Sequence, residues 1–256
     1  MIDFDPLDYR NFIHGVVSKS FLARKKWFSF TLWDEELIFF WNNGDIRCHK
    51  NSCRHYSLPL SQGKLTNGHV ICGFHGWKYE LSEGNLIHSP YSNKTPKCKL
   101  KGYKAFIKNG IVFVYAGDEE YFEKAKQFVI SDITENQASF GVVYEVPFYL
   151  ALNAAVDYPH FAFHKYFYPI YSIFRWTFFK KNTMMTTYTP VILEETDVYY
   201  KYKVLECNVE VTVYPFCVKI YDLVSKNEWQ IFILPISKTK SRYLHTIKSH
   251  SKNKLF

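Results

Sequence analysis

The chain has 256 residues, enough for one large domain or two modest ones. Its hydrophobic content of 47% excludes an intrinsically disordered chain. The formal charge of +8 comes from scattered lysines, a pattern that suits an anionic substrate or an acidic partner and argues against nucleic acid. No apolar run approaches the roughly 18 residues of a membrane span, and the acidic start "MIDFDPLDYR" is unlike a secretory signal. We therefore expect a cytoplasmic protein without a membrane span.

The first predicted elements are closely spaced short strands. The runs "WFSFTLW", "LIFFW" and "IRCHK" come first, with the turn "NNGD" before the third. Asn43 and Gly44 between aromatic-rich runs predict a β-hairpin. Further strands are expected at "HVICGF", "WKYEL", "NLIHSP", "KAFIKNG" and "IVFVYAG". The pattern is typical of a small all-β domain, which we place at residues 20–118.

A second domain is predicted over residues 119–256. The charged segment "DEEYFEKAKQF" forms a helical bridge into it. The first half of "YLALNAAVDYPHFAFHKYF" contains good helix formers, and long alternating runs such as "EWQIFILPIS" then predict an antiparallel sheet with one covered face. The fold class is therefore α+β, an all-β domain followed by a helix-plus-antiparallel-sheet domain.

Two mixed pairs of metal-binding side chains lie in the first domain. Cys53 and His55 form a Cys-x-His pair, and Cys72 and His75 form a Cys-x-x-His pair. Thiolates and imidazoles suit zinc or an iron–sulfur cluster. Structural zinc sites usually pair two cysteines or two histidines within one knuckle. A [2Fe–2S] cluster can instead have two thiolates on one iron and two imidazoles on the other, and each loop then supplies one ligand of each kind. A zinc knuckle stays the alternative.

The segment around these residues resembles the Rieske family. "CRH", "LPLSQG" and "CGFHGWKYELSEGNL" follow the family pattern, which implies a [2Fe–2S] cluster held by Cys53, His55, Cys72 and His75. The resemblance also implies a low potential, nearer about −150 than +300 mV, because the extra loop cysteines and the serine of respiratory-type centres are replaced here.

A second motif lies downstream in "NAAVDYPHFAFH". Asp157, His160 and His164 would share one helix face, and two imidazoles with a carboxylate can bind a divalent metal. With Asn153, they resemble the Asp-x-x-His-x3–4-His motif of the α-subunits of Rieske non-heme iron oxygenases. The resemblance implies a helix-grip-like catalytic domain in which His160 and His164 bind mononuclear Fe(II) and Asp157 is the catalytic bridging carboxylate.

Two features depart from that motif. Pro159 should kink or restart the helix. The family's third iron ligand is usually a late aspartate, and no Asp or Glu follows Glu228 here. Three options stay open: Asp222 or Glu228 replaces it, a water molecule replaces it, or the C-terminus is shortened and the site is impaired.

The resemblance implies the activation of O2 for hydroxylation or demethylation of a small organic substrate, which the sequence does not identify. An external reductase or ferredoxin would supply electrons, which would pass from the cluster to Asp157 of an adjacent subunit in a homotrimer. One alternative is a Rieske electron-transfer or ligand-binding protein whose second domain has lost catalytic iron. Another is a metal-binding structural subunit of a larger complex.

Overall fold

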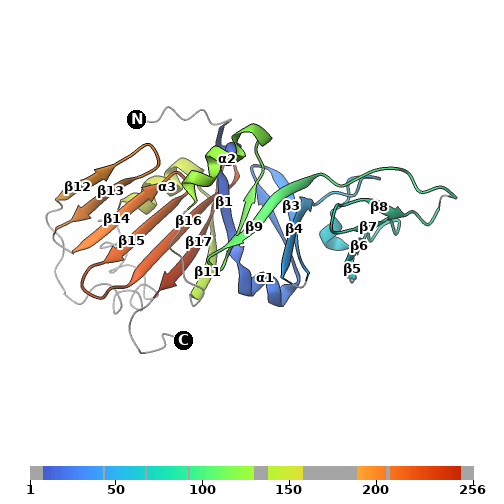
Figure 1. Cartoon of the computed structure of the whole chain (residues 1–256), viewed down its shortest axis with the longest axis horizontal. Coiled ribbons are helices and arrows are strands. Elements are labelled where there is room, and N and C mark those ends of the chain that lie inside the picture. The colour runs from blue at the N-terminus through green and yellow to red at the C-terminus, as the bar shows by residue number, and fades with distance from the viewer. Residues whose placement is uncertain are drawn as a thin grey trace. The chain divides into compact units, whose positions relative to one another are not determined.

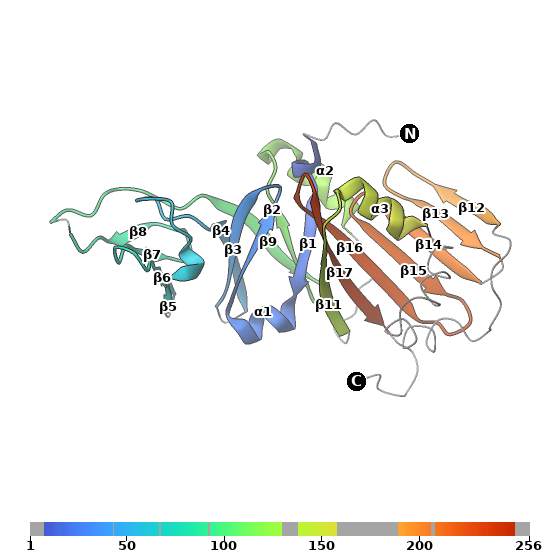
Figure 2. The same cartoon turned by 180° about the vertical axis from the view of Figure 1, so that it is seen from behind.

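The computed structural model describes residues 8–42, 44–66, 68–91, 93–129, 138–157, 189–205 and 208–248. The chain divides into two compact units, Met1–Ile133 and Thr134–Phe256. Each unit consists of antiparallel strands and a few short helices, as Figures 1 and 2 show, which confirms the α+β class. Among the helices of the described ranges, none is long and apolar enough to cross a membrane.

The first unit contains a six-stranded sheet in the order β1-β10-β9-β4-β3-β2. Its strands are β1 (Ile13–Ser18), β2 (Trp27–Leu32), β3 (Glu35–Asn42), β4 (Asp45–Lys50), β9 (Gly102–Lys108) and β10 (Ile111–Tyr115). The predicted hairpin is present, since Asn42 pairs with Asp45 where β3 turns into β4. Helix α1 (Lys19–Lys25) joins β1 to β2, and the side chain of Ser18 caps its start.

A smaller four-stranded sheet in the order β5-β6-β7-β8 follows β4 and lies at one end of the first unit (Figure 1). After the short helix η2 (Leu60–Gln62) come β5 (Lys64–Thr66), β6 (His69–Ile71), β7 (Lys78–Glu80) and β8 (Leu86–His88). Successive side chains of a strand point to opposite faces, so one cross-strand row, Leu65, Val70, Tyr79 and Leu86, faces inward. This row packs into a buried core that includes Cys53 and Cys72.

The segment after β10 forms the predicted helical bridge as three short pieces. These are η3 (Glu119–Tyr121), α2 (Phe122–Ala125) and η4 (Lys126–Phe128), and a further short helix, η1 (Asp8–Asn11), precedes β1. Only Ala125 is buried within α2, so the bridge is a mostly exposed connection.

The second unit is one seven-stranded antiparallel sheet in the order β11-β17-β16-β15-β14-β13-β12. Its strands are β11 (Ala138–Tyr144), β12 (Pro190–Glu195), β13 (Tyr200–Val204), β14 (Val209–Tyr214), β15 (Cys217–Asp222), β16 (Glu228–Ser237) and β17 (Lys240–Lys248). Helix α3 (Phe148–Val156) crosses one face of this sheet (Figure 2). The hydroxyls of Tyr243 and Tyr202 donate to the carbonyls of Ala151 and Val156 and so fasten the helix to the sheet.

Candidate functional site

The two loops that carry the predicted cluster ligands have the same backbone hydrogen bonds. In the first loop the amide of Cys53 donates to the carbonyl of Leu58 at 2.8 Å, and the amide of Ser57 donates to the carbonyl of Cys53. In the second, Cys72 bonds in the same way to Trp77 at 2.8 Å, and Gly76 to Cys72. Ser57 and Gly76, at the equivalent position, both have positive φ, 58° and 67°. The chain therefore forms one loop shape twice, each time beginning at a cysteine.

The start of the second loop lies against the backbone of Gln62 and Gly63, and glycines on both sides permit this close approach. A Cβ on Gly63 would lie 2.1 Å from the carbonyl oxygen of Ile71, directly before Cys72. A Cβ on Gly73 would lie 2.9 Å from the carbonyl oxygen of Gln62. Real Cβ atoms do not approach backbone that closely, so only glycine permits this contact. The close approach therefore sets the position of the backbone on both sides of Cys72.

The two cysteines form the buried side of the site. Cys53 is 2% exposed and Cys72 is 3% exposed, and their thiols contact one another. Burial, together with the neighbouring Cys53, raises the pKa of Cys72 above its usual value. A bound metal would keep both cysteines deprotonated, as thiolates, in this apolar environment.

The two histidines form the open side of the site. His55 is exposed and His75 is half-buried, and their ring centroids lie 4.8 Å apart. The indole of Trp77 stacks on His55 at 4.6 Å with an interplanar angle of 2°. The aromatic rings of Tyr56 and Phe74 also contact the pair, at 4.2 Å from His55 and 4.0 Å from His75. These contacts fix both imidazole rings at the surface.

The donor set fits a [2Fe–2S] cluster, since two sulfur donors lie together inside and two nitrogen donors lie together outside. Among the described residues, no three His, Cys, Asp or Glu side chains converge in the manner of a single-ion site. Cys48 and His49, which the sequence assigns to a strand, lie in β4 and are buried. His49 Nε2 donates to the carbonyl of Leu81 at 3.0 Å and so has a structural partner.

Tyr79 is a site residue that the sequence reasoning missed. Its hydroxyl lies 3.3 Å from Cys53 Sγ and accepts a hydrogen bond from the amide of Arg54 at 3.1 Å. With Cys53 as a thiolate, the hydroxyl must be the donor to sulfur. Burial raises the pKa of Tyr79, and the side chain is 0% exposed, so this donor is permanent. The available signal was the strand alternation of "WKYEL", which points Tyr79 toward the ligands.

Tyr79→Phe is expected to lower the reduction potential of the cluster by about 40 mV. A hydrogen bond to sulfur stabilises the more negative reduced state, and a net contribution of about 1 kcal/mol corresponds to roughly 40 mV for one electron. Redox titration followed by electron paramagnetic resonance measures the shift. Tyr115→Phe, which removes a hydroxyl bonded to the Asp118 carbonyl in the same unit, is the matched control. An unchanged potential in Tyr79→Phe would show that this hydroxyl does not act on the cluster.

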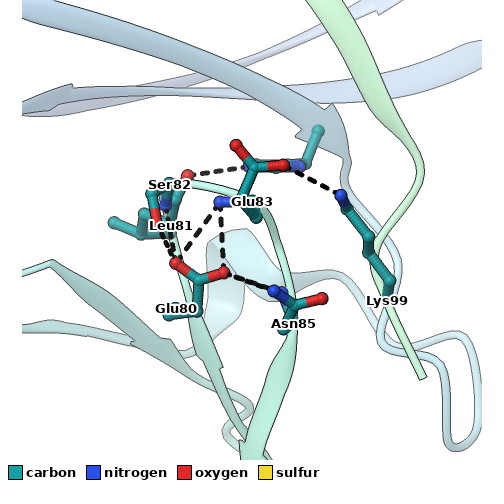
Figure 3. A network of polar contacts seen from close by, with 7 residues as sticks. Glu80, Leu81, Ser82, Glu83, Asn85 and Lys99 are labelled. Carbon is teal, nitrogen blue, oxygen red and sulfur yellow. Dashed lines mark hydrogen bonds and ion pairs between the residues drawn. The ribbon is translucent and has the colours of Figure 1, made fainter. Parts of the chain in front are cut away.

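The Glu80 carboxylate closes the turn between β7 and β8. Figure 3 shows the Glu80 carboxylate accepting hydrogen bonds from the amides of Glu83 and Asn85 and from the Asn85 side chain at 2.9 Å. The Ser82 hydroxyl also donates to it. Partial burial opposes the effect, but these hydrogen bonds hold the pKa of Glu80 below its usual value. At the base of the first loop, the side chain of Asn51 also binds backbone: the amide of Ser61 donates a hydrogen bond to Asn51 Oδ1 at 2.8 Å.

The second predicted motif is described only in part. Helix α3 ends at Val156, so Asn153 lies in its last turn and Asp157 is its C-cap, with its amide bonded to the Asn153 carbonyl at 3.0 Å. Both side chains are exposed. His160 and His164 lie outside the described residues, as does Pro159.

The two acids considered for the third iron ligand already have partners in the sheet. Asp222 is buried and accepts the amides of Val224 at 2.8 Å and Ser225 at 3.1 Å, which closes the turn after β15. Glu228 is buried and pairs with Lys219 at 3.0 Å, while Gln230 donates to its other carboxylate oxygen at 2.7 Å. Both carboxylates therefore have a structural role in the second unit.

Comparison with known proteins gives matches to the cluster region and to the fold. Residues 14–104 match the model of the Rieske [2Fe-2S] domain. Chlorophyllide a oxygenase of Arabidopsis thaliana is 32% identical over 83 residues, which are 32% of this chain and 15% of that protein. Each of the first three curated relatives is matched over less than a fifth of its own length.

Two solved structures extend the likeness to nearly the whole chain. Dicamba monooxygenase bound to 3,6-dichlorosalicylic acid superposes with a TM-score of 0.74 at 14% identity, covering 95% of this chain and 78% of its own. An oxygenase–ferredoxin complex of carbazole 1,9a-dioxygenase gives 0.69 at 16% identity, with coverages of 95% and 73%. Residues 14–104 therefore match a Rieske [2Fe-2S] domain, in a chain that has the fold of the carbazole 1,9a-dioxygenase oxygenase and of dicamba monooxygenase.

Proposed function

We propose that this chain is a Rieske-type oxygenase component that uses a [2Fe–2S] cluster and mononuclear Fe(II) to activate O2 for hydroxylation or demethylation of a small organic substrate. One observation carries the proposal: paired cysteine and histidine loops occur in a chain whose fold follows oxygenase structures over 95% of its length. The names of the relatives, among them a chlorophyllide a oxygenase and a dicamba O-demethylase, support the same class.

In this proposal the two predicted domains have different roles. Residues 20–118 hold the cluster through Cys53, Cys72, His55 and His75, and residues 119–256 form a helix-grip-like catalytic domain. The cluster, when bound, supplies one electron at a time. The buried cysteines exclude water from its inner side, and the outward histidines give electrons a short path to a partner.

The proposed mononuclear site uses His160 and His164, with Asp157 as the carboxylate between the two metal centres. The exposed position of Asp157 at the end of α3 supports this role, since a C-cap can reach a neighbouring subunit. The partners of Asp222 and Glu228 within the sheet disfavour both as the third ligand. When bound, Fe(II) supplies the position at which O2 is activated.

The proposed partners are an electron donor and further copies of the chain. Solved relatives include an oxygenase with its ferredoxin, which supports an external ferredoxin or reductase as donor. A homotrimer would place the histidines of one subunit near Asp157 of the next. Electrons would then pass between subunits through that carboxylate.

Iron content tests the proposal. Protein reconstituted anaerobically is expected to hold about three irons per chain, and His160→Ala/His164→Ala about two, because only the mononuclear iron depends on these imidazoles. Plasma emission spectrometry counts the metal, and visible absorbance follows the cluster. His69→Ala/His88→Ala, which removes two histidines of the four-stranded sheet, is the matched control and should keep three.

A second candidate is an electron-transfer or ligand-binding protein whose second domain has lost catalytic iron. The partners of Asp222 and Glu228 favour it, since neither carboxylate is then left over to bind iron. Two irons in the wild-type protein, with no further uptake of added Fe(II), would select this candidate and overturn the oxygenase proposal.

A further inference from the structure

The outer face of the four-stranded sheet carries a cross-strand row of basic residues. Lys64 of β5 pairs with Ile71 of β6, Ile71 with Lys78 of β7, and Lys78 with His88 of β8. Adjacent strands are about 4.8 Å apart, so the two lysines are about 10 Å apart at Cα on one face. Their neighbours Leu65 and Tyr79 belong to the inward row. We call Lys64, Ile71, Lys78 and His88 the basic face.

The lysines are scattered along the chain, but the net positive charge is concentrated in this region because few acids lie there. Residues 50–104 contain nine lysine and arginine residues and two glutamates, a net charge of +7 out of the +8 of the whole chain. Four of these lysines, 50, 99, 101 and 104, form ion pairs. Lys64 and Lys78 form no ion pair with any described residue. A concentrated charge of one sign attracts partners of the opposite sign.

The two glutamates of this region do not offset the basic face. The carboxylate of Glu80 is turned into its own loop, where it accepts hydrogen bonds from Ser82, Glu83 and Asn85 (Figure 3). Glu83 is paired with Lys99 at 3.0 Å, as the same figure shows. Neither acid therefore reaches across to Lys64 or Lys78.

The basic face adjoins the cluster loops through the backbone. Ile71, in the middle of the row, directly precedes Cys72, and Lys78 directly follows Trp77, which stacks on His55 at 4.6 Å. A protein bound at Lys64 and Lys78 would therefore have its surface beside the second ligand loop. Electron transfer from a docked carrier requires such a position beside the cluster ligands.

We propose that the basic face is the docking surface for an acidic one-electron carrier protein. This inference rests on the proposed function, in which the cluster receives external electrons. One electron leaves the reduced carrier and is taken up by the cluster, with no bond made or broken. A second copy of the chain fits the face less well, because the residues outside 50–104 have a net charge of +1 and the whole chain one of +8, so two copies repel one another overall.

Binding of an acidic plant-type [2Fe–2S] ferredoxin to the cluster-loaded protein tests the inference. At low ionic strength, Lys64→Gln/Lys78→Gln is expected to raise the Kd at least fivefold and to flatten its dependence on salt, because two charges leave the contact. Stopped-flow reduction by the same ferredoxin should slow about as much. Lys25→Gln/Lys124→Gln removes two exposed lysines from α1 and α2 and is the matched control, expected to behave like the wild type.

Reduction by a photoreduced flavin separates the two proposals. If both variants and the wild type are reduced by the flavin but bind ferredoxin equally well, the docking surface is wrong and the redox function stands. If the flavin reduces none of them, the proposed function fails and this inference fails with it. If Lys64→Gln/Lys78→Gln changes the oligomeric state in sedimentation and leaves ferredoxin binding unchanged, the face contacts a second copy and the proposal is overturned.

Discussion

Gly63→Ala is expected to abolish cluster binding. A Cβ at this position would lie 2.1 Å from the carbonyl oxygen of Ile71, which belongs to backbone and cannot rotate away. Lys64 and Ile71 are paired partners of β5 and β6, so relieving the clash must shift this pairing and with it Cys72. Overpacking against backbone of this kind costs about 3 kcal/mol or more. Visible absorbance and iron per chain should both fall to near the level of the apoprotein.

Gly102→Ala is the matched control, because the nearest atom to its Cβ would be 3.8 Å away, an ordinary contact. This variant should load its cluster like the wild type. Circular dichroism of both variants separates loss of the cluster from loss of the fold, and the six-stranded sheet should survive in each. A Gly63→Ala protein with a full cluster would show that cluster binding does not need the close approach of Gly63 to Ile71.

Local patterns predicted the fold wherever a strand has one covered face or a distinctive turn. The Asn43–Gly44 signal predicted the β3–β4 hairpin, and the alternating runs of the second unit predicted β13 to β15. The run "EWQIFILPIS" predicted β16 through its apolar content, since the first eight residues of that strand are all buried. The sequence did not predict β1, whose six residues are all buried. A strand covered on both faces shows no alternation, and "IHGVVS" also contains a histidine and a glycine. Its place beside β10 depends on pairing across nearly a hundred residues.

The cluster ligands could be predicted because their spacing is local, within two loops of a few residues each. The contacts that shape the site are not local. Tyr79 bonds to Cys53 across 26 positions, and Asn51 to Ser61 across ten. Strand alternation could have indicated that Tyr79 points inward, but its sulfur partner depends on how two loops meet. The sequence could not select a third iron ligand, since the ion pair of Glu228 with Lys219 depends on the sheet register and Asp222 closes the turn after β15.

His245 of β17 is held neutral inside the second unit. It is 6% exposed, and the indole N–H of Trp229 donates to its Nδ1 at 3.1 Å. The ring of Phe140 stacks on it at 4.7 Å, and Tyr243 contacts its edge at 5.6 Å. Burial lowers the pKa of His245 to about 3. Protonation would place a charge among aromatic rings and would repel the indole donor.

The free energy of unfolding is therefore expected to fall by about 2 kcal/mol more in the wild type than in His245→Gln between pH 7 and pH 5. An unfolded histidine titrates near about 6.5, so acid below that pH protonates the unfolded state first. The depressed pKa of the folded state thus contributes stability above about pH 6.5 that is lost as pH falls toward 3. Urea unfolding at the two pH values measures the difference, and glutamine can still accept the Trp229 hydrogen bond.

His69→Gln, at a half-buried position, should keep the wild-type pH dependence. Equal pH dependence in the wild type and His245→Gln would mean that His245 already carries a proton in the folded protein at pH 5.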